Sequence, residues 1–115
     1  MMVGIIDYGV GNLFSLKSSL AAIGAKALVT SDPELIKSAD RIILPGVGAF
    51  EDAAEKLSSA GLAELVISEA KKGKPILGIC LGMQLLFDKS LEYGEHKGLG
   101  LISGEIRPSA DVIPG

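Results

Sequence analysis

Residues 75–87 carry the feature that most constrains the fold, because the only cysteine of the chain stands there between two glycines. A proline-led apolar run precedes Cys80, and a leucine-rich segment follows it. The spacing Gly78-x-Cys80-x-Gly82 is the cysteine form of the nucleophile elbow, a tight strand-to-helix turn whose nucleophile adopts an unfavourable backbone conformation. We therefore predict a buried parallel strand and then a helix. The thiol is expected at the helix N-terminus, where unpaired N–H groups stabilise a thiolate.

The rest of the chain alternates between short apolar runs and stretches with helical spacing. This alternation predicts an α/β fold built on a mostly parallel sheet, and 115 residues suffice for one domain with a core. The expected strands are residues 3–6, 27–30, 41–44 and the run before Cys80, and the expected helices are 13–23, 31–39 and 50–72, the last broken near Gly61.

The C-terminal third has a weaker pattern. Met83, Leu85, Leu86 and Phe87 are expected to be core residues. After them we expect a polar loop through Lys97, followed by a hairpin or edge strands at 99–102 and 105–107 with Gly104 in the turn.

Three loops are expected to leave the carboxyl edge of the sheet, where parallel α/β folds bind ligands. They are residues 7–12, residues 45–49 and the elbow at Cys80. Backbone N–H groups of the glycine loop at 45–48, together with that of Leu81, can bind the oxyanion of a tetrahedral intermediate. Gln84 lies one helical turn after Cys80, so its amide is expected to reach a ligand in the same pocket.

The composition argues against several other classes of protein. The net charge of −3 gives no basic footprint for nucleic acid, and no apolar run approaches the length of a membrane span. One cysteine and one histidine fall short of a metal site, and no cofactor is expected. His96 stands among polar residues and is expected to lie on the surface. Without a disulfide pair or a signal segment, the expected compartment is the cytoplasm.

Four segments together resemble the class I glutamine amidotransferases, and within that family the glutaminase subunits of histidine biosynthesis. Residues 78–86, GICLGMQLL, resemble the nucleophile motif, and the other segments are 7–12 (DYGVGN), 44–50 (LPGVGAF) and 98–102 (GLGLI). The resemblance runs from Met1 to about Arg107. It implies a flavodoxin-like three-layer sandwich and a Cys-His-Glu triad that hydrolyses glutamine to glutamate and ammonia.

The same resemblance implies the chemical roles of three residues. Cys80 is the nucleophile that attacks the side-chain amide of glutamine and forms a glutamyl thioester. Val47 and Leu81 supply the oxyanion N–H groups, and the loop that contains Val47 is expected to reorient first.

The resemblance also implies binding roles. Gly48, Gln84 and Glu92 correspond to positions that hold the substrate glutamine. Asn12 corresponds to a position at the interface with a barrel-shaped cyclase subunit, which receives the ammonia through a channel.

Members of the family are close to twice as long as this chain, and their catalytic histidine and glutamate lie in the C-terminal half. Residues 1–115 are therefore expected to be the N-terminal part of a single glutamine amidotransferase domain. On this expectation the chain alone is inactive or nearly so, because the thiol lacks a proton donor for the leaving ammonia. The sheet edge exposed by the missing half is expected to be covered, for example by self-association.

Two other functions stay open at this stage. One is a non-catalytic flavodoxin-like half-domain that serves as an assembly or binding unit. The other is a small-molecule or phosphate-binding domain that uses residues 9–12. Its fingerprint is weak, because Gly9-x-Gly11 lacks a third glycine where Phe14 stands.

Overall fold

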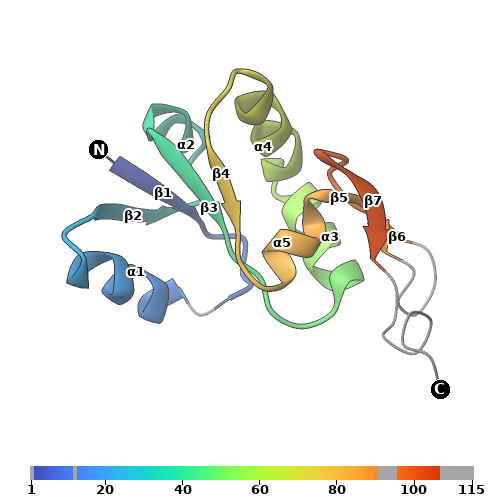
Figure 1. The fold of residues 1–115 in the computed structure, drawn as a ribbon, viewed down its shortest axis with the longest axis horizontal. Helices are drawn as coiled ribbons and strands as arrows, with labels where there is room; N and C mark the ends of the chain where they lie inside the picture. Colours follow the sequence, from blue (N-terminus) through green and yellow to red (C-terminus); the bar gives the residue numbers. More distant parts are fainter. Residues whose placement is uncertain (1, 12, 91–95, 107–115) are drawn as a thin grey trace.

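A computed structural model describes residues 2–11, 13–90 and 96–106 of the chain (Figure 1). Its main sheet has four parallel strands in the order β2-β1-β3-β4. The strands are β1 (Met2–Ile6), β2 (Lys26–Thr30), β3 (Arg41–Leu44) and β4 (Ile76–Gly78), and the described helices are α1 (Leu13–Ala22), α2 (Pro33–Ser38), α3 (Phe50–Ser59), α4 (Leu62–Lys71) and α5 (Leu81–Leu85). None of these described helices is long and apolar enough to cross a membrane.

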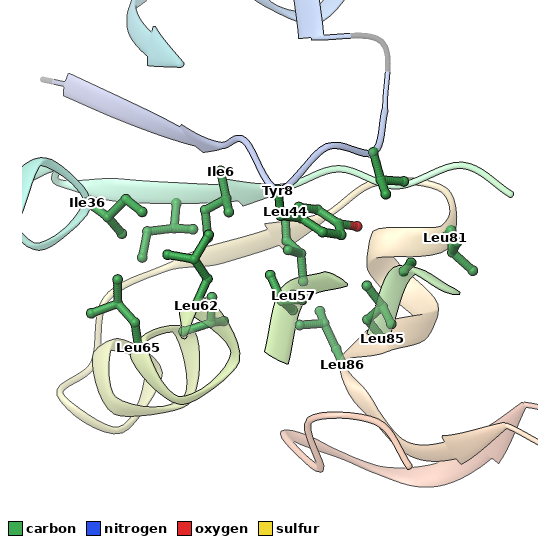
Figure 2. Close-up of a cluster of buried hydrophobic side chains, with 14 of the residues drawn as sticks. Ile6, Tyr8, Ile36, Leu44, Leu57, Leu62, Leu65, Leu81, Leu85 and Leu86 are labelled. Carbon is green, nitrogen blue, oxygen red and sulfur yellow. The ribbon is translucent and has the colours of Figure 1, made fainter. Parts of the chain in front are cut away.

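Helices cover both faces of the main sheet, which confirms the predicted three-layer α/β fold. Successive residues of a strand point to opposite faces, so Ile5 and Ile6 of β1 enter different clusters. Ile5 packs with Val3 and Ile43 next to α1, whereas Ile6 joins a larger cluster with residues of α3, α4 and α5 (Figure 2). Both isoleucines are fully buried. The sheet is therefore a packed middle layer that supports the loops at its carboxyl edge.

The helix ends lie close to their predicted positions because the signals for them are local. The Asp32 side chain accepts a 3.0 Å hydrogen bond from the Glu34 N–H, and Pro33 begins α2. Gly61 has a φ of +75°, which glycine adopts without strain, and it separates α3 from α4. The break near Gly61 is confirmed, and the two helices bury Leu57, Leu62, Leu65 and Val66 against the sheet.

The segment after α5 forms a second, smaller sheet. The predicted polar loop is wrong at residues 88–90 and 96–97, which are strands, while its residues 91–95 lie outside the described part of the chain, and the predicted hairpin is also wrong. β5 (Phe87–Ser90) pairs parallel with β7 (Ile102–Ile106) and antiparallel with β6 (His96–Lys97). Gly104 lies inside β7 instead of in a turn. The expected strand does not start at residue 99, because the N–H groups of 99–101 donate to the carbonyl oxygens of 85–87 at the end of α5. Pairing between distant segments leaves little local signal.

β4 is an edge strand of the main sheet, and the prediction that it is buried is wrong. Within the described ranges it pairs only with β3, and Leu77 is 57% exposed. Met83 of α5, predicted to be core, is 49% exposed, whereas Leu85 and Leu86 are buried as predicted. An apolar run does not distinguish a central strand from an edge strand, because the difference depends on what pairs on its other side.

Candidate active site

Cys80 occupies a strained turn immediately before α5. Its φ is +54° and its ψ is −124°, and no other non-glycine residue in the described part of the chain has a positive φ. A non-glycine residue keeps such a backbone conformation only where the surrounding structure enforces it, and strained residues of this kind are common at functional sites. The predicted elbow conformation is confirmed, and the residue is exposed.

Glycines allow the elbow to pack directly against the loop after β3. A Cβ atom on Gly78 would lie 2.5 Å from the Met83 Cα, and one on Gly82 would overlap the Leu44 carbonyl oxygen. A Cβ atom on Gly46 would lie 2.8 Å from the Gly82 backbone nitrogen. Side chains at these positions would push the backbones apart, so the close approach depends on the absence of Cβ atoms.

A pocket of about 360 Å³ opens over the elbow. The elbow and α5 line one side of it, the glycine loop 46–48 lines the other, and Phe50 completes the wall. Phe50 is buried at the first position of α3, and its place two residues after Gly48 was the sequence signal that could have identified it. Five residues predicted from the sequence therefore surround one cavity: Val47, Gly48, Cys80, Leu81 and Gln84.

The Leu81 N–H is engaged by the protein in this structure and is not free to bind an oxyanion. It donates a 3.1 Å hydrogen bond to the Gly46 carbonyl oxygen. That carbonyl and the Val47 N–H belong to one planar trans peptide and point in opposite directions. With the Gly46 oxygen bonded to Leu81, the Val47 N–H is directed away from Leu81. The described state thus lacks both predicted oxyanion donors.

Tyr8 contacts the glycine loop from the loop after β1 and was not predicted. Its hydroxyl donates a 2.5 Å hydrogen bond to the Pro45 carbonyl oxygen, and its side chain is buried. Burial raises the pKa of Tyr8 to about 12, so the phenol stays protonated and remains a donor near neutral pH. The strand order reverses between β1 and β3, which brings the two loops together. The sequence places the loop 7–12 at this edge of the sheet, but no pattern within that loop distinguishes Tyr8 from its neighbours.

Two of the predicted site residues, Asn12 and Glu92, lie outside the residues that the structure describes. His96 begins β6 of the second sheet and does not stand in a loop. Within the described ranges, no three histidine, cysteine, aspartate or glutamate side chains lie together in a way that could bind a metal ion. The pocket offers a substrate one thiol, one side-chain amide and the backbone of a glycine loop.

Comparison with known proteins places the same segments in one family. The family model for glutamine amidotransferase class-I matches residues 4–105. The imidazole glycerol phosphate synthase subunit HisH of Wolinella succinogenes is 58% identical over 107 residues, which are 93% of this chain and 52% of that protein. The subunit of the same name from Bacillus licheniformis is 52% identical over 105 residues, or 91% of this chain and 50% of that protein. The chain spans about half the length of the curated relatives it matches.

A solved structure gives an independent comparison of the fold. The protein described as "Crystal structure of glutamine amidotransferase" matches 96% of this chain with a TM-score of 0.79. The match covers 58% of that protein at 21% sequence identity. At this identity the likeness concerns the fold alone.

Proposed function

Because this chain belongs to the class I glutamine amidotransferase family, we propose that it carries the nucleophile and the oxyanion loop of a glutaminase. The observation that carries the proposal is the strained conformation of Cys80 beside a pocket lined by the glycine loop 46–48. A thiol held in this way can attack a carbonyl carbon, and backbone N–H groups can stabilise the resulting oxyanion. The proposed reaction is the hydrolysis of glutamine to glutamate and ammonia.

In the first step the Cys80 thiolate sulfur bonds to the carbonyl carbon of the glutamine side-chain amide, and the carbonyl electron pair moves onto the oxygen. The C–N bond then breaks, and the nitrogen takes a proton and leaves as ammonia. Water hydrolyses the glutamyl thioester to glutamate and restores the thiol. We propose that the general acid and base belong to the half of the family domain that residues 1–115 do not span.

Substrate binding is proposed for Gln84, Gly48 and Glu92. Gln84 and Gly48 support this by lining the same pocket as Cys80. Glu92 rests on the family resemblance alone, since its structure is not described. A side-chain amide and a backbone N–H together suit the polar end groups of glutamine, which needs donors for its carboxylate and acceptors for its ammonium.

The oxyanion site is proposed to form when the peptide between Gly46 and Val47 turns over. The turn would break the hydrogen bond from Leu81 to the Gly46 oxygen and bring the Val47 N–H to the same side as the Leu81 N–H. Val47 is 56% exposed, so its side chain gives the turn little steric resistance. Two backbone donors would then face the position of the oxyanion.

The names of the similar proteins suggest a partner for the proposed glutaminase. The relatives are named as subunits of imidazole glycerol phosphate synthase. We propose that the ammonia passes to a barrel-shaped cyclase subunit, which makes imidazole glycerol phosphate and aminoimidazole carboxamide ribotide in histidine biosynthesis. Asn12 is the proposed contact with that subunit. A cytoplasmic location fits a chain whose single cysteine is kept as a thiol.

We also propose that residues 1–115 are part of one glutamine amidotransferase domain whose sheet continues beyond β4. Among the described strands β4 has a partner on one side only, and the exposed Leu77 stands on it. An unpaired apolar edge recruits further strands. When these 115 residues are produced alone, this edge is proposed to pair with a second copy.

Covalent labelling tests the proposed nucleophile. The chain, with the second half of a relative and the cyclase subunit supplied, is incubated with a chloroketone analogue of glutamine, and peptide mass spectrometry identifies the modified residue. We expect one adduct, on Cys80, that forms more slowly in excess glutamine and is absent from Cys80→Ala. Iodoacetamide is the control, because it alkylates thiols without first occupying a glutamine site. Chloroketone labelling that glutamine does not slow, or no chloroketone adduct on a thiol that iodoacetamide modifies, contradicts the proposal.

The complete reaction needs a second measurement. Glutamate formation is followed for the chain alone and with the second half of a relative and the cyclase subunit supplied. We expect activity only in the complemented mixture, and none there with Cys80→Ala. A mixture that assembles but stays inactive would favour a non-catalytic assembly unit.

A further inference from the structure

One hydrogen bond joins the loops after β1 and β3 across the point where the strand order reverses. The Tyr8 hydroxyl donates to the Pro45 carbonyl oxygen at 2.5 Å. Figure 2 shows the Tyr8 ring among the side chains of the main cluster, with its hydroxyl oxygen on the side of α5. Pro45 directly precedes Gly46, whose carbonyl accepts the Leu81 N–H. The hydroxyl thus holds the peptide next to the one that is proposed to turn.

The glycine loop is closely packed up to Gly46 and is exposed to solvent at Val47. A Cβ atom on Gly46 would lie 2.9 Å from the Tyr8 hydroxyl oxygen, and one on Gly11 would lie 3.2 Å from the Pro45 Cβ. Val47, by contrast, is more than half exposed. The packing therefore restrains the loop up to Gly46 and leaves the next residue free to move.

We propose that Tyr8 is a positioning residue for the oxyanion loop, an inference that rests on the proposed glutaminase function. Its hydrogen bond fixes the peptide between Pro45 and Gly46, so that rotation is confined to the following peptide. The Val47 N–H then turns to one defined position relative to Cys80. Proline has a fixed φ and no N–H, so its carbonyl is the backbone polar group through which this residue can be held.

Tyr8→Phe separates this role from packing, because phenylalanine keeps the buried ring and removes only the hydroxyl. The chloroketone carbonyl becomes an oxyanion when the thiolate adds to it, so misplaced donors slow its reaction. We expect Tyr8→Phe to lower the rate of Cys80 labelling by the chloroketone at least about tenfold. Iodoacetamide reacts by direct displacement of iodide and forms no oxyanion, so its rate with Cys80 stays unchanged.

Ser38→Ala is the matched control, since the Ser38 hydroxyl donates a 2.8 Å hydrogen bond to the Leu35 carbonyl oxygen at the end of α2. It should change neither rate. If Tyr8→Phe slows both reagents equally, or neither, the positioning role is overturned while the glutaminase proposal stands. If circular dichroism shows Tyr8→Phe to be unfolded at the assay temperature, the hydroxyl serves the whole fold and the inference also fails. If the unmodified chain is not labelled by the chloroketone, the proposed function is contradicted, and the inference that rests on it fails as well.

Discussion

The backbone N–H of Leu81 and the carbonyl oxygen of Gly46 are joined by a 3.1 Å hydrogen bond across the candidate active site. In this state the Cys80 side chain is accessible while a donor next to it is engaged. Attack on a carbonyl would lack the electrostatic stabilisation that is usually the largest single contribution to such a step. The geometry of the glycine loop therefore matters as much as the thiol itself.

Gly46→Ala is expected to disrupt the site. The new Cβ atom would lie 2.8 Å from the Gly82 nitrogen and 3.1 Å from the Leu81 Cβ, so the elbow would have to move. We expect the free energy of unfolding to fall by about 1–3 kcal/mol, as for other overpacked sites, and chloroketone labelling of Cys80 to be lost. Urea denaturation and mass spectrometry measure the two effects.

Gly61→Ala is the control for this loss of stability. Gly61 has open space around it but a φ of +75°, so alanine is strained there by about 1 kcal/mol without touching the pocket. Its labelling should match that of the unmodified chain. Normal labelling of Gly46→Ala would mean that the contact between loop and elbow is not needed for the site.

Gln84→Ala is expected to weaken glutamine binding without changing the thiol. Gln84 lines the pocket one helical turn after Cys80, where its amide can hydrogen-bond the substrate. Losing a hydrogen bond to a charged group should raise the glutamine concentration that half-protects Cys80 about tenfold. Met83→Ala, an exposed neighbour on α5, is the control and should leave protection unchanged. Equal protection in Gln84→Ala and the unmodified chain would remove Gln84 from substrate binding.

Much of the main sheet and the elbow could be predicted because their signals are local. The strand at Arg41–Leu44 is bounded by Pro45, and Gly61 breaks the long helical pattern into α3 and α4. Two glycines two residues from Cys80 indicate a tight turn whichever strands lie beside it. Pro45, Gly61 and the two glycines around Cys80 each end or bend an element, and each of them can be recognised directly in the sequence.

The contacts that close the site could not be predicted, because they join segments far apart in the chain. Tyr8 and Pro45 are 37 residues apart, and nothing in either loop indicates their hydrogen bond. The engagement of the Leu81 N–H by Gly46 depends on the orientation of a single peptide. The exposure of Leu77 depends on its strand being at the edge, which the order of the strands decides.

Acid is expected to weaken the fold through Glu69. This buried carboxylate lies 2.7 Å from the Lys74 ammonium and 3.2 Å from that of Lys72. The hydrogen bond from Lys74 is the main cause that lowers the pKa of Glu69 below its ordinary 4.5, and burial acts in the opposite direction. Stability from a lowered pKa is fully present above the unfolded pKa and is lost as the pH falls through the folded pKa. We therefore expect the free energy of unfolding to decline as the pH falls below about 4.5.

Glu69→Gln should remove part of that decline, because the amide does not titrate. Urea denaturation between neutral pH and the acid range measures it for both proteins. Glu55→Gln, which removes an exposed carboxylate from α3, controls for the change in net charge. If the free energies of unfolding of Glu69→Gln and the unmodified chain fall equally as the pH is lowered, the acid sensitivity is due to other groups.

Leu77→Lys is expected to reduce self-association of the 115-residue chain. Leu77 is 57% exposed on the edge strand β4, and a lysine on an edge opposes strand addition by a second copy. Sedimentation velocity should show a concentration-dependent dimer for the unmodified chain and a shift to monomer for the variant. Leu35→Lys, on the surface of α2, is the control and should leave the dimer intact. A monomer at every concentration of the unmodified chain would contradict pairing through this edge.

Cys80→Gly is expected to stabilise the fold while abolishing labelling. At φ +54° and ψ −124° a side chain is strained, and glycine relieves that strain. The Cys80 side chain is exposed, so little packing is lost with it. Glycine also increases the conformational freedom of the unfolded chain, which offsets part of this effect. We expect the free energy of unfolding to rise by about 1 kcal/mol. Cys80→Ala keeps the Cβ atom and hence the strain, so the difference between the two variants in urea denaturation isolates the backbone effect. If Cys80→Gly is no more stable than Cys80→Ala, the turn is not strained, and strain ceases to support the assignment of Cys80 as a nucleophile.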